Sequence, residues 1–199
     1  MRVVIHMQSA RGPRTGIGHY TWELAQALAA LEPQLLRPYP TAWERLFTHW
    51  YERQWAKYAA APRHAWTNRL RGRCLLTARR LGARSYTEQL QRILRRERID
   101  LYHEPCYIPL ECDAPIITSV HDLSVLRFPQ WHRRETVALF EKHFDAALRR
   151  SQHLLAISEF GKQEIIRYLG WPAERVSVSY MGVRAGLGRV GGVRLQRAL

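Results

Sequence analysis

Cysteine is scarce in this sequence, which has three among 199 residues. An odd number of cysteines cannot pair completely, which argues against a disulfide framework. The N-terminus also lacks the charged and apolar segments of a secretory leader, because the apolar run starting at Val3 follows the first two residues directly. We therefore expect a reducing, cytoplasmic environment.

Long apolar runs are absent as well. No run approaches the roughly 18 residues that a helix needs to cross a bilayer, which excludes a transmembrane segment. Hydrophobic residues nevertheless make up 46% of the chain. A chain of this length can bury the core of one α/β domain but not of two, so we expect a single folded domain.

Acidic residues are few, with 17 Asp and Glu against 31 Lys and Arg and a net charge of +14. The excess is concentrated in residues 63–98, which hold eleven arginines and two glutamates. Such a field attracts nucleic acid, an anionic lipid surface or a diphosphate-bearing substrate. The alternative explanation of the arginine excess is the codon usage of a GC-rich genome. Nucleic acid is not an expected partner, because the sequence has neither a recognition-helix motif nor an aromatic RNA platform.

The sequence does contain short apolar runs that alternate regularly with segments of helical periodicity. The runs predict strands at residues 3–7, 99–102, 115–120, 153–157 and 176–181. The helices between them are predicted to have the apolar faces Tyr20, Leu24, Leu28 and Leu31; Tyr86, Leu90, Ile93 and Leu94; Val137, Phe140, Phe144 and Leu148; and Ile165, Ile166 and Leu169. This alternation favours right-handed crossovers and the α/β class, with a doubly wound parallel sheet of Rossmann-like type.

Two regions depart from the alternation. Residues 37–85 are less regular and contain an aromatic stripe followed by a basic cluster. These residues are Trp43, Phe47, Tyr51, Trp55 and Tyr58, then Arg69, Arg71, Arg73, Arg79, Arg80 and Arg84. They would suit an anionic membrane surface; the alternative is that the rings pack against the sheet and the arginines are solvated. Residues 184–199 hold four arginines, four glycines and no acid. We therefore assign the domain to residues 1–183 and a tail to 184–199, either a flexible terminus or a segment translated out of frame.

Polar residues cluster at the carboxyl ends of four predicted strands. They are residues 12–18, His103–Glu104, His121–Asp122 and Ser158–Glu159. In an open parallel sheet, ligands bind in the crevice outside these ends. The sequence therefore predicts one half of a substrate cleft.

The glycine-rich segment of residues 12–18 lies between a strand and a helix and includes Gly16 and Gly18. Backbone without side chains lets a ligand approach the positive end of the helix. The third glycine of the dinucleotide fingerprint is missing, and no acidic residue ends a second strand, so we do not expect a nicotinamide site. The alternative is a tight turn without a ligand.

The histidine and carboxylate pairs offer more specific chemistry. An imidazole and a carboxylate leaving a strand end together, as at His121–Asp122, can hydrogen-bond sugar hydroxyls or act as acid and base, although such a pair can also be structural. His103–Glu104 repeats the arrangement one strand earlier. A metal site using His103, Cys106 and Cys112 matches no zinc spacing, so no metal is expected. Ser158 is most simply a helix N-cap, with a ligand contact as a second role, and no nucleophile elbow surrounds it.

Four motifs in the same order resemble the N-terminal half of family 4 glycosyltransferases. They are TGIGHYT at residues 15–21, VHDL at 120–123 with Phe-Pro at 128–129, AISEFGK at 156–162, and PAERVSV at 172–178 followed by MGV at 181–183. Within that family, the chain is most similar to the bacterial mannosyltransferase-like branch that acts on surface polysaccharides. The resemblance extends over residues 1–183.

The resemblance implies a GT-B architecture, in which two Rossmann-like domains close over a nucleotide sugar and transfer the sugar with retention and without a metal. It implies that the N-terminal domain receives the acceptor. Gly16 and Gly18 would lie near the donor diphosphate, and His121 beside the transferred sugar as the catalytic group. Ser158 would line the cleft, and His103, Glu104 and Asp122 would contribute further substrate contacts.

Two departures from the family pattern shape the functional hypothesis. His19 stands where an arginine often follows the glycine pair. The basic pair and the paired glutamates that hold the donor belong to the C-terminal domain, which we expect to be missing. The first hypothesis is a cytoplasmic transferase domain that moves a sugar, with GDP-mannose as one candidate donor, to a glycan or lipid-linked acceptor; peripheral contact with the inner membrane face is one of the two alternatives for residues 43–84. The alternative is a non-catalytic remnant, or one half of a split transferase whose partner chain supplies the donor site.

Overall fold

The computed structural model describes residues 1–10, 14–40, 53 and 86–182. These residues form a six-stranded sheet in the order β2-β1-β3-β4-β5-β6, and every pair of neighbouring strands is parallel. The strands are β1 (Val3–His6), β2 (Leu36–Tyr39), β3 (Leu101–Glu104), β4 (Ile116–Val120), β5 (His153–Ala156) and β6 (Val176–Val178). The predicted α/β class with a parallel sheet is confirmed.

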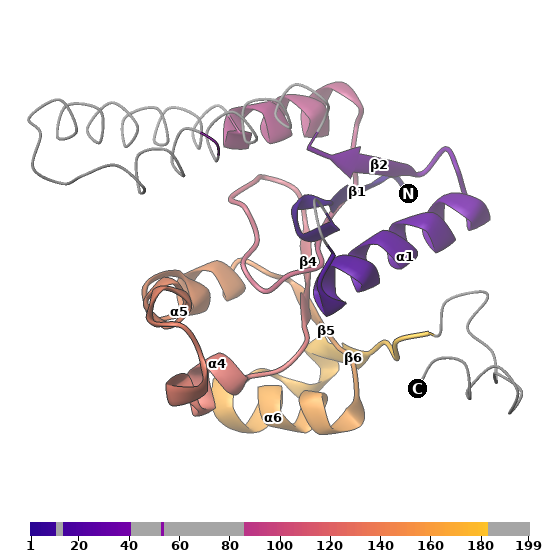
Figure 1. Cartoon of the computed structure of the whole chain (residues 1–199). Coiled ribbons are helices and arrows are strands. Elements are labelled where there is room, and N and C mark those ends of the chain that lie inside the picture. Colours follow the sequence, from indigo (N-terminus) through magenta and orange to yellow (C-terminus); the bar gives the residue numbers. More distant parts are fainter. Residues whose placement is uncertain (11–13, 41–52, 54–85, 183–199) are drawn as a thin grey trace, which may run out of the picture.

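Helices cover both faces of the sheet, as Figure 1 shows. They are α1 (Gly16–Leu31), a helix at residues 86–96, α4 (Ser124–Arg127), α5 (Arg134–Leu148) and α6 (Glu159–Leu169), with short 3-10 turns η1 (Gln8–Ala10), η2 (Pro129–Trp131) and η3 (Ala173–Arg175). The chain leaves β1 toward β2 through α1 and returns to the other side of β1 through the helix at residues 86–96. The sheet is therefore doubly wound, with its change of direction at β1.

The hydrophobic core consists of two clusters, and both contain apolar positions predicted from helical spacing. Leu90 and Leu94 pack in a cluster with Val4, Tyr102 and Ile116. The second cluster lies under α5 and α6 and includes Phe140, Phe144, Leu148, Leu154, Ile165 and Val176. The predicted faces of these three helices are confirmed, because their apolar stripes are continuous enough to specify the packing.

Three details of the prediction were wrong. The last two residues of β3 are His103 and Glu104, which were expected to follow that strand. The edge strand β2 was not predicted, because an exposed arginine and Pro38 interrupt its apolar pattern, and proline is tolerated at an edge. The buried residues of α1 are the small Gly18, Thr21 and Ala25, whereas Leu31 of the expected apolar face is 77% exposed.

Several predictions fall outside the described residues. These are the aromatic stripe at residues 43–58, the basic cluster at 69–84, the first part of the glycine-rich segment, and the tail at 184–199. The domain limit at residue 183 stays a prediction for the same reason. Within the described ranges, no helix combines the length and the apolar character needed to cross a bilayer.

Candidate functional site

The strand order reverses between β1 and β3, and this is the position where open parallel sheets bind ligands at their carboxyl edge. The start of α1 and the ends of β3 and β4 meet there. Tyr20 on α1 provides the link, because its ring lies 4.8 Å from the ring of His121 and its hydroxyl lies 3.1 Å from Ser119 Oγ. The predicted residues His103 and His121 are thereby brought into one cluster.

His103 occupies the buried part of this cluster. Its Nε2 is 2.9 Å from Ser119 Oγ, so that His103, Ser119 and Tyr20 form a hydrogen-bonded chain from β3 through β4 to α1. Burial lowers the pKa of His103 to about 4 because the charged imidazolium would lose its hydration. At neutral pH, His103 is therefore an uncharged member of the cluster.

His121 is held in one orientation at the end of β4. Its Nε2 donates to the carbonyl oxygen of Pro105 at 2.8 Å, and its ring lies between those of Tyr20 and Tyr107. Burial lowers the pKa of His121, although the Pro105 hydrogen bond and the charge of Asp122 oppose the change. Because a carbonyl can only accept, Nε2 carries the proton and Nδ1 keeps a lone pair. Nδ1 makes no hydrogen bond with any residue that the structure describes. His121 therefore presents a fixed hydrogen-bond acceptor.

Asp122 supplies the negative charge beside this imidazole. Its Oδ1 accepts from the backbone N–H of Ser124 at 2.8 Å and from the Ser124 hydroxyl at 2.6 Å, which tie it to the start of α4. Partial burial raises the pKa of Asp122, but these hydrogen bonds and one from Tyr107 lower it more. The carboxylate is thus ionised at neutral pH and remains exposed.

Tyr20 and Tyr107 are functional candidates that the sequence analysis missed. Tyr20 was assigned to an apolar helix face, although its hydroxyl and ring both belong to the cluster. Tyr107 has φ of 58°, in the left-handed region that a bulky residue rarely adopts. Its ring packs 5.6 Å from that of His121. The left-handed backbone at Tyr107 had no signal in the sequence, whereas Tyr20 lies two residues after Gly18 and could have been included.

Glu104 lies apart from this cluster, because successive side chains of a strand point to opposite faces. It is 2% exposed, and its oxygens accept from Tyr102 at 2.7 Å and from the backbone N–H of Cys106 at 3.0 Å. His6 Nδ1 lies 2.5 Å from the same carboxylate, and His6 Nε2 is 3.0 Å from the Tyr86 hydroxyl. These contacts join β1, β3 and the helix at residues 86–96.

The glycines and Ser158 have clear local roles. A Cβ on Gly18 would lie 2.4 Å from the carbonyl oxygen of Ser9, so α1 can pack against η1 only with glycine there. A Cβ on Gly16 would meet nothing within 4 Å. Ser158 Oγ accepts from the backbone N–H of Gly161 at 3.0 Å, which confirms it as the N-cap of α6. In the described part of the chain, no three His, Cys, Asp or Glu residues are grouped closely enough to hold a metal ion.

Comparison with known proteins identifies the family. The sequence profile of Glycosyltransferase Family 4 matches residues 14–186, which is most of the chain. The chain belongs to glycosyltransferase family 4. It is 28% identical over 184 residues to O-antigen chain mannosyltransferase B of Escherichia coli, covering 88% of this chain and 46% of that protein.

Among solved structures, this family 4 chain is similar to a glycosyltransferase from Rickettsia africae ESF-5. The TM-score is 0.47 and the sequence identity 12%, with 99% of this chain and 48% of that chain covered. The chain spans about half the length of these two proteins.

Proposed function

We propose that the chain acts in sugar transfer as the acceptor-side domain of a family 4 glycosyltransferase. The sugar would come from a nucleotide sugar and pass to a glycan or lipid-linked acceptor, with retention at the anomeric carbon. Family membership supports the reaction class. The name of the Escherichia coli relative supports a mannose donor, with GDP-mannose as the first one to test.

The observation that carries the proposal is the unprotonated Nδ1 of the fixed, neutral His121 at the carboxyl edge. A sugar hydroxyl can donate to this nitrogen. During transfer, the bond between the anomeric carbon and the diphosphate breaks, the acceptor oxygen bonds to that carbon, and the proton of the acceptor hydroxyl passes to the leaving diphosphate. Positive charge develops on the sugar ring as the first bond breaks. An imidazolium beside that charge would repel it, whereas a neutral imidazole can bind the sugar without this penalty.

The neighbouring residues would position His121 rather than contact the reacting carbon. The Tyr20 ring packs edge-on against the imidazole at an interplanar angle of 88°, and its hydroxyl is bound to the buried Ser119. Tyr107 supports a second edge of the imidazole ring. We assign His103 to this supporting group and Asp122 to hydrogen bonds with sugar hydroxyls. Gly16 and Gly18 would lie near the donor diphosphate, and Ser158 would line the same cleft.

A transfer assay with His121→Ala tests this function. The chain, alone and combined with a cell extract that supplies any partner protein, is incubated with sugar-labelled GDP-mannose or UDP-sugars and a glycan acceptor. We expect His121→Ala to lower the transfer rate by about 10²-fold or more, the scale of a positioned polar catalytic group.

The matched control is His153→Ala. His153 is the first residue of β5, at the opposite, amino-terminal edge of the sheet, and its imidazole is hydrogen-bonded to the Ser177 hydroxyl. This variant should retain transfer within a few-fold. Equal rates for the two variants would return His121 to a structural role. Sugar binding without transfer in any combination would favour a non-catalytic binding module.

A further inference from the structure

Four side chains form a stacked surface beyond the cleft, which we call the aromatic ladder: Trp131, Phe128, Arg127 and Tyr168. The rings of Phe128 and Trp131 are parallel within 13°, with centroids 4.4 Å apart. The Arg127 guanidinium lies 5.1 Å from the Phe128 ring centroid and 4.4 Å from that of Tyr168. The ladder thus joins the end of α4 and η2 to α6.

The ladder is held in place although it is open to solvent. Arg127 also forms an ion pair with Glu164 of α6, which fixes its guanidinium between the two rings. Trp131 is nevertheless 70% exposed and Tyr168 46% exposed. Exposed aromatic surface that is already ordered loses little conformational entropy on binding, and this favours a recognition role.

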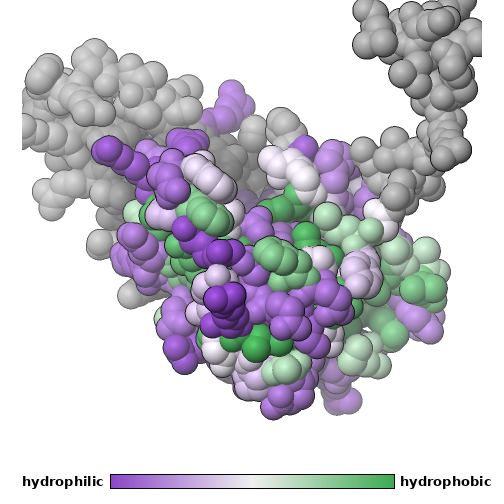
Figure 2. Space-filling model, turned by 90° about the horizontal axis from the view of Figure 1, so that it is seen from below, coloured by the Kyte–Doolittle hydropathy of each residue, from purple (hydrophilic) through white to green (hydrophobic). Residues whose placement is uncertain are grey.

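The ladder combines aromatic rings with hydrogen-bonding groups. Arg127 is paired with Glu164, which offsets the charge of its guanidinium. Arg167, with its guanidinium 5.3 Å from the Tyr168 ring, can donate to hydroxyl groups. Figure 2, which views the molecule from the side of α6, shows hydrophobic residues in separate groups among hydrophilic ones. A sugar polymer suits such a mixed surface, because its C–H faces pack on aromatic rings and its hydroxyls form hydrogen bonds.

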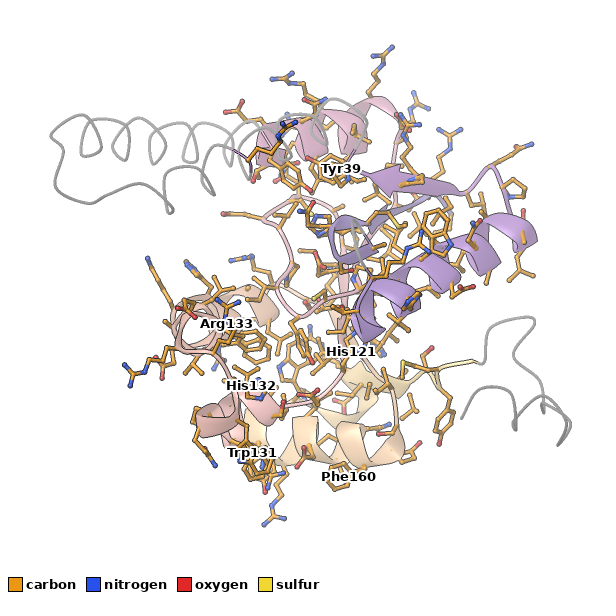
Figure 3. All side chains as sticks on the ribbon, in the orientation of Figure 1. Tyr39, His121, Trp131, His132, Arg133 and Phe160 are labelled. Atoms are coloured by element: carbon orange, nitrogen blue, oxygen red, sulfur yellow. The ribbon has the colours of Figure 1, made fainter. Side chains whose placement is uncertain are left out.

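A short stretch of chain links the ladder to the candidate site. Asp122 accepts a hydrogen bond from the backbone N–H of Ser124, the first residue of α4. The turn η2, which contains Trp131, begins two residues after α4 ends. Figure 3 shows His121 in the interior and Trp131 toward the outside of the molecule. From this arrangement we infer that the aromatic ladder is a second carbohydrate-binding surface, which holds sugar units of a glycan acceptor beyond the unit that reacts near His121. The inference rests on the proposed function.

Nuclear magnetic resonance of the 15N-labelled chain tests the ladder. The indole N–H signal of Trp131 is identified by its loss in Trp131→Ala. Tetrasaccharides of mannose, glucose and galactose are then titrated, with the three monosaccharides as weaker-binding references. We expect a saturable shift of the Trp131 signal with at least one tetrasaccharide. Calorimetry should show that Trp131→Ala and Tyr168→Ala each weaken that affinity about fivefold or more.

Phe160→Ala is the matched control, because Phe160 is 71% exposed on α6 and is not part of the ladder. It should leave the affinity for the tetrasaccharide unchanged.

The inference is overturned if no tetrasaccharide shifts the Trp131 signal at millimolar concentration, or if Phe160→Ala weakens binding as much as Trp131→Ala. It is also overturned if Trp131→Ala abolishes binding to phosphatidylglycerol vesicles or self-association instead. Tetrasaccharide binding without sugar transfer would contradict the proposed function alone. Sugar transfer by Trp131→Ala with an unchanged affinity for the tetrasaccharide would contradict the ladder alone.

Discussion

At the scale of single residues, burial sets the charge of the two central histidines. His103 and His121 both have lowered pKa values because their rings are largely removed from water. Each ring is also fixed by a hydrogen bond, to Ser119 and to Pro105 respectively. The site therefore consists of neutral donors and acceptors with one carboxylate, Asp122, at its rim. Such a site suits hydroxyl groups better than anions.

His103 should make stability depend on pH. Its pKa is about 4 in the folded chain and about 6.5 when unfolded. Below pH 6.5 the unfolded chain therefore binds a proton that the folded chain does not. The contribution of neutral His103 to the free energy of unfolding is complete above pH 6.5 and is lost as the pH falls toward 4. We expect this group to lower the free energy of unfolding by roughly 2 kcal/mol between pH 7 and pH 5.

Urea denaturation of the chain and of His103→Gln at both pH values measures this contribution as a difference. The variant keeps a side chain that can hydrogen-bond to Ser119 but does not titrate. Its stability should fall less on acidification than that of the unmodified chain. Equal falls would show that His103 is not the group responsible.

At the scale of elements, the packing of α1 was harder to predict than the packing of α5. The stripe Phe140, Phe144 and Leu148 is both apolar and buried, so spacing alone identified the inner face of α5. In α1 the inner face is made of small residues, because the helix approaches Ser9 closely at Gly18. Hydrophobic periodicity cannot detect a contact that depends on the absence of a side chain.

Gly18 and Gly16 should therefore respond differently to the same substitution. Gly18→Ala places a methyl group against the Ser9 carbonyl and should lower the free energy of unfolding by about 1 to 3 kcal/mol. Gly16→Ala meets open space and should be neutral or stabilising by up to about 1 kcal/mol. Thermal and urea denaturation of both variants provide the comparison. Equal stability of the two would contradict the close packing of α1 on η1.

The contacts of Glu104 predict a structural contribution between elements. Glu104→Ala leaves His6 and Tyr102 without their buried partner and should lower the free energy of unfolding by about 3 kcal/mol or more. Glu111→Ala, at an exposed carboxylate nearby, should change it by about 0.5 kcal/mol at most. A stable Glu104→Ala variant that had lost sugar binding would instead support direct substrate contact.

At the scale of the whole molecule, the doubly wound order determines where the site lies. The sequence was sufficient to predict the α/β class and five of the six strands, because their apolar runs are short and regularly spaced. From the sequence, the side chains of His103 and Glu104 were expected in one cleft. In the structure they lie apart, because adjacent residues of β3 face opposite sides of the sheet. The sequence also could not show that Tyr20 links α1 to His121, since that contact depends on three-dimensional packing.

In the proposed function, His121 at the carboxyl edge contacts the sugar of a nucleotide-sugar substrate. This contact is tested by the histidine ring signals in 1H–13C spectra of the 13C-labelled chain, recorded together with an unlabelled, dialysed cell extract that supplies any partner protein. The titrants are GDP-mannose, UDP-sugars, and GDP or UDP alone. If His121 contacts the sugar, at least one nucleotide sugar shifts the His121 signal while the matching nucleotide does not, and the His153 signal stays in place. Equal shifts with the nucleotide alone, or no shift with any nucleotide sugar at millimolar concentration, would contradict it.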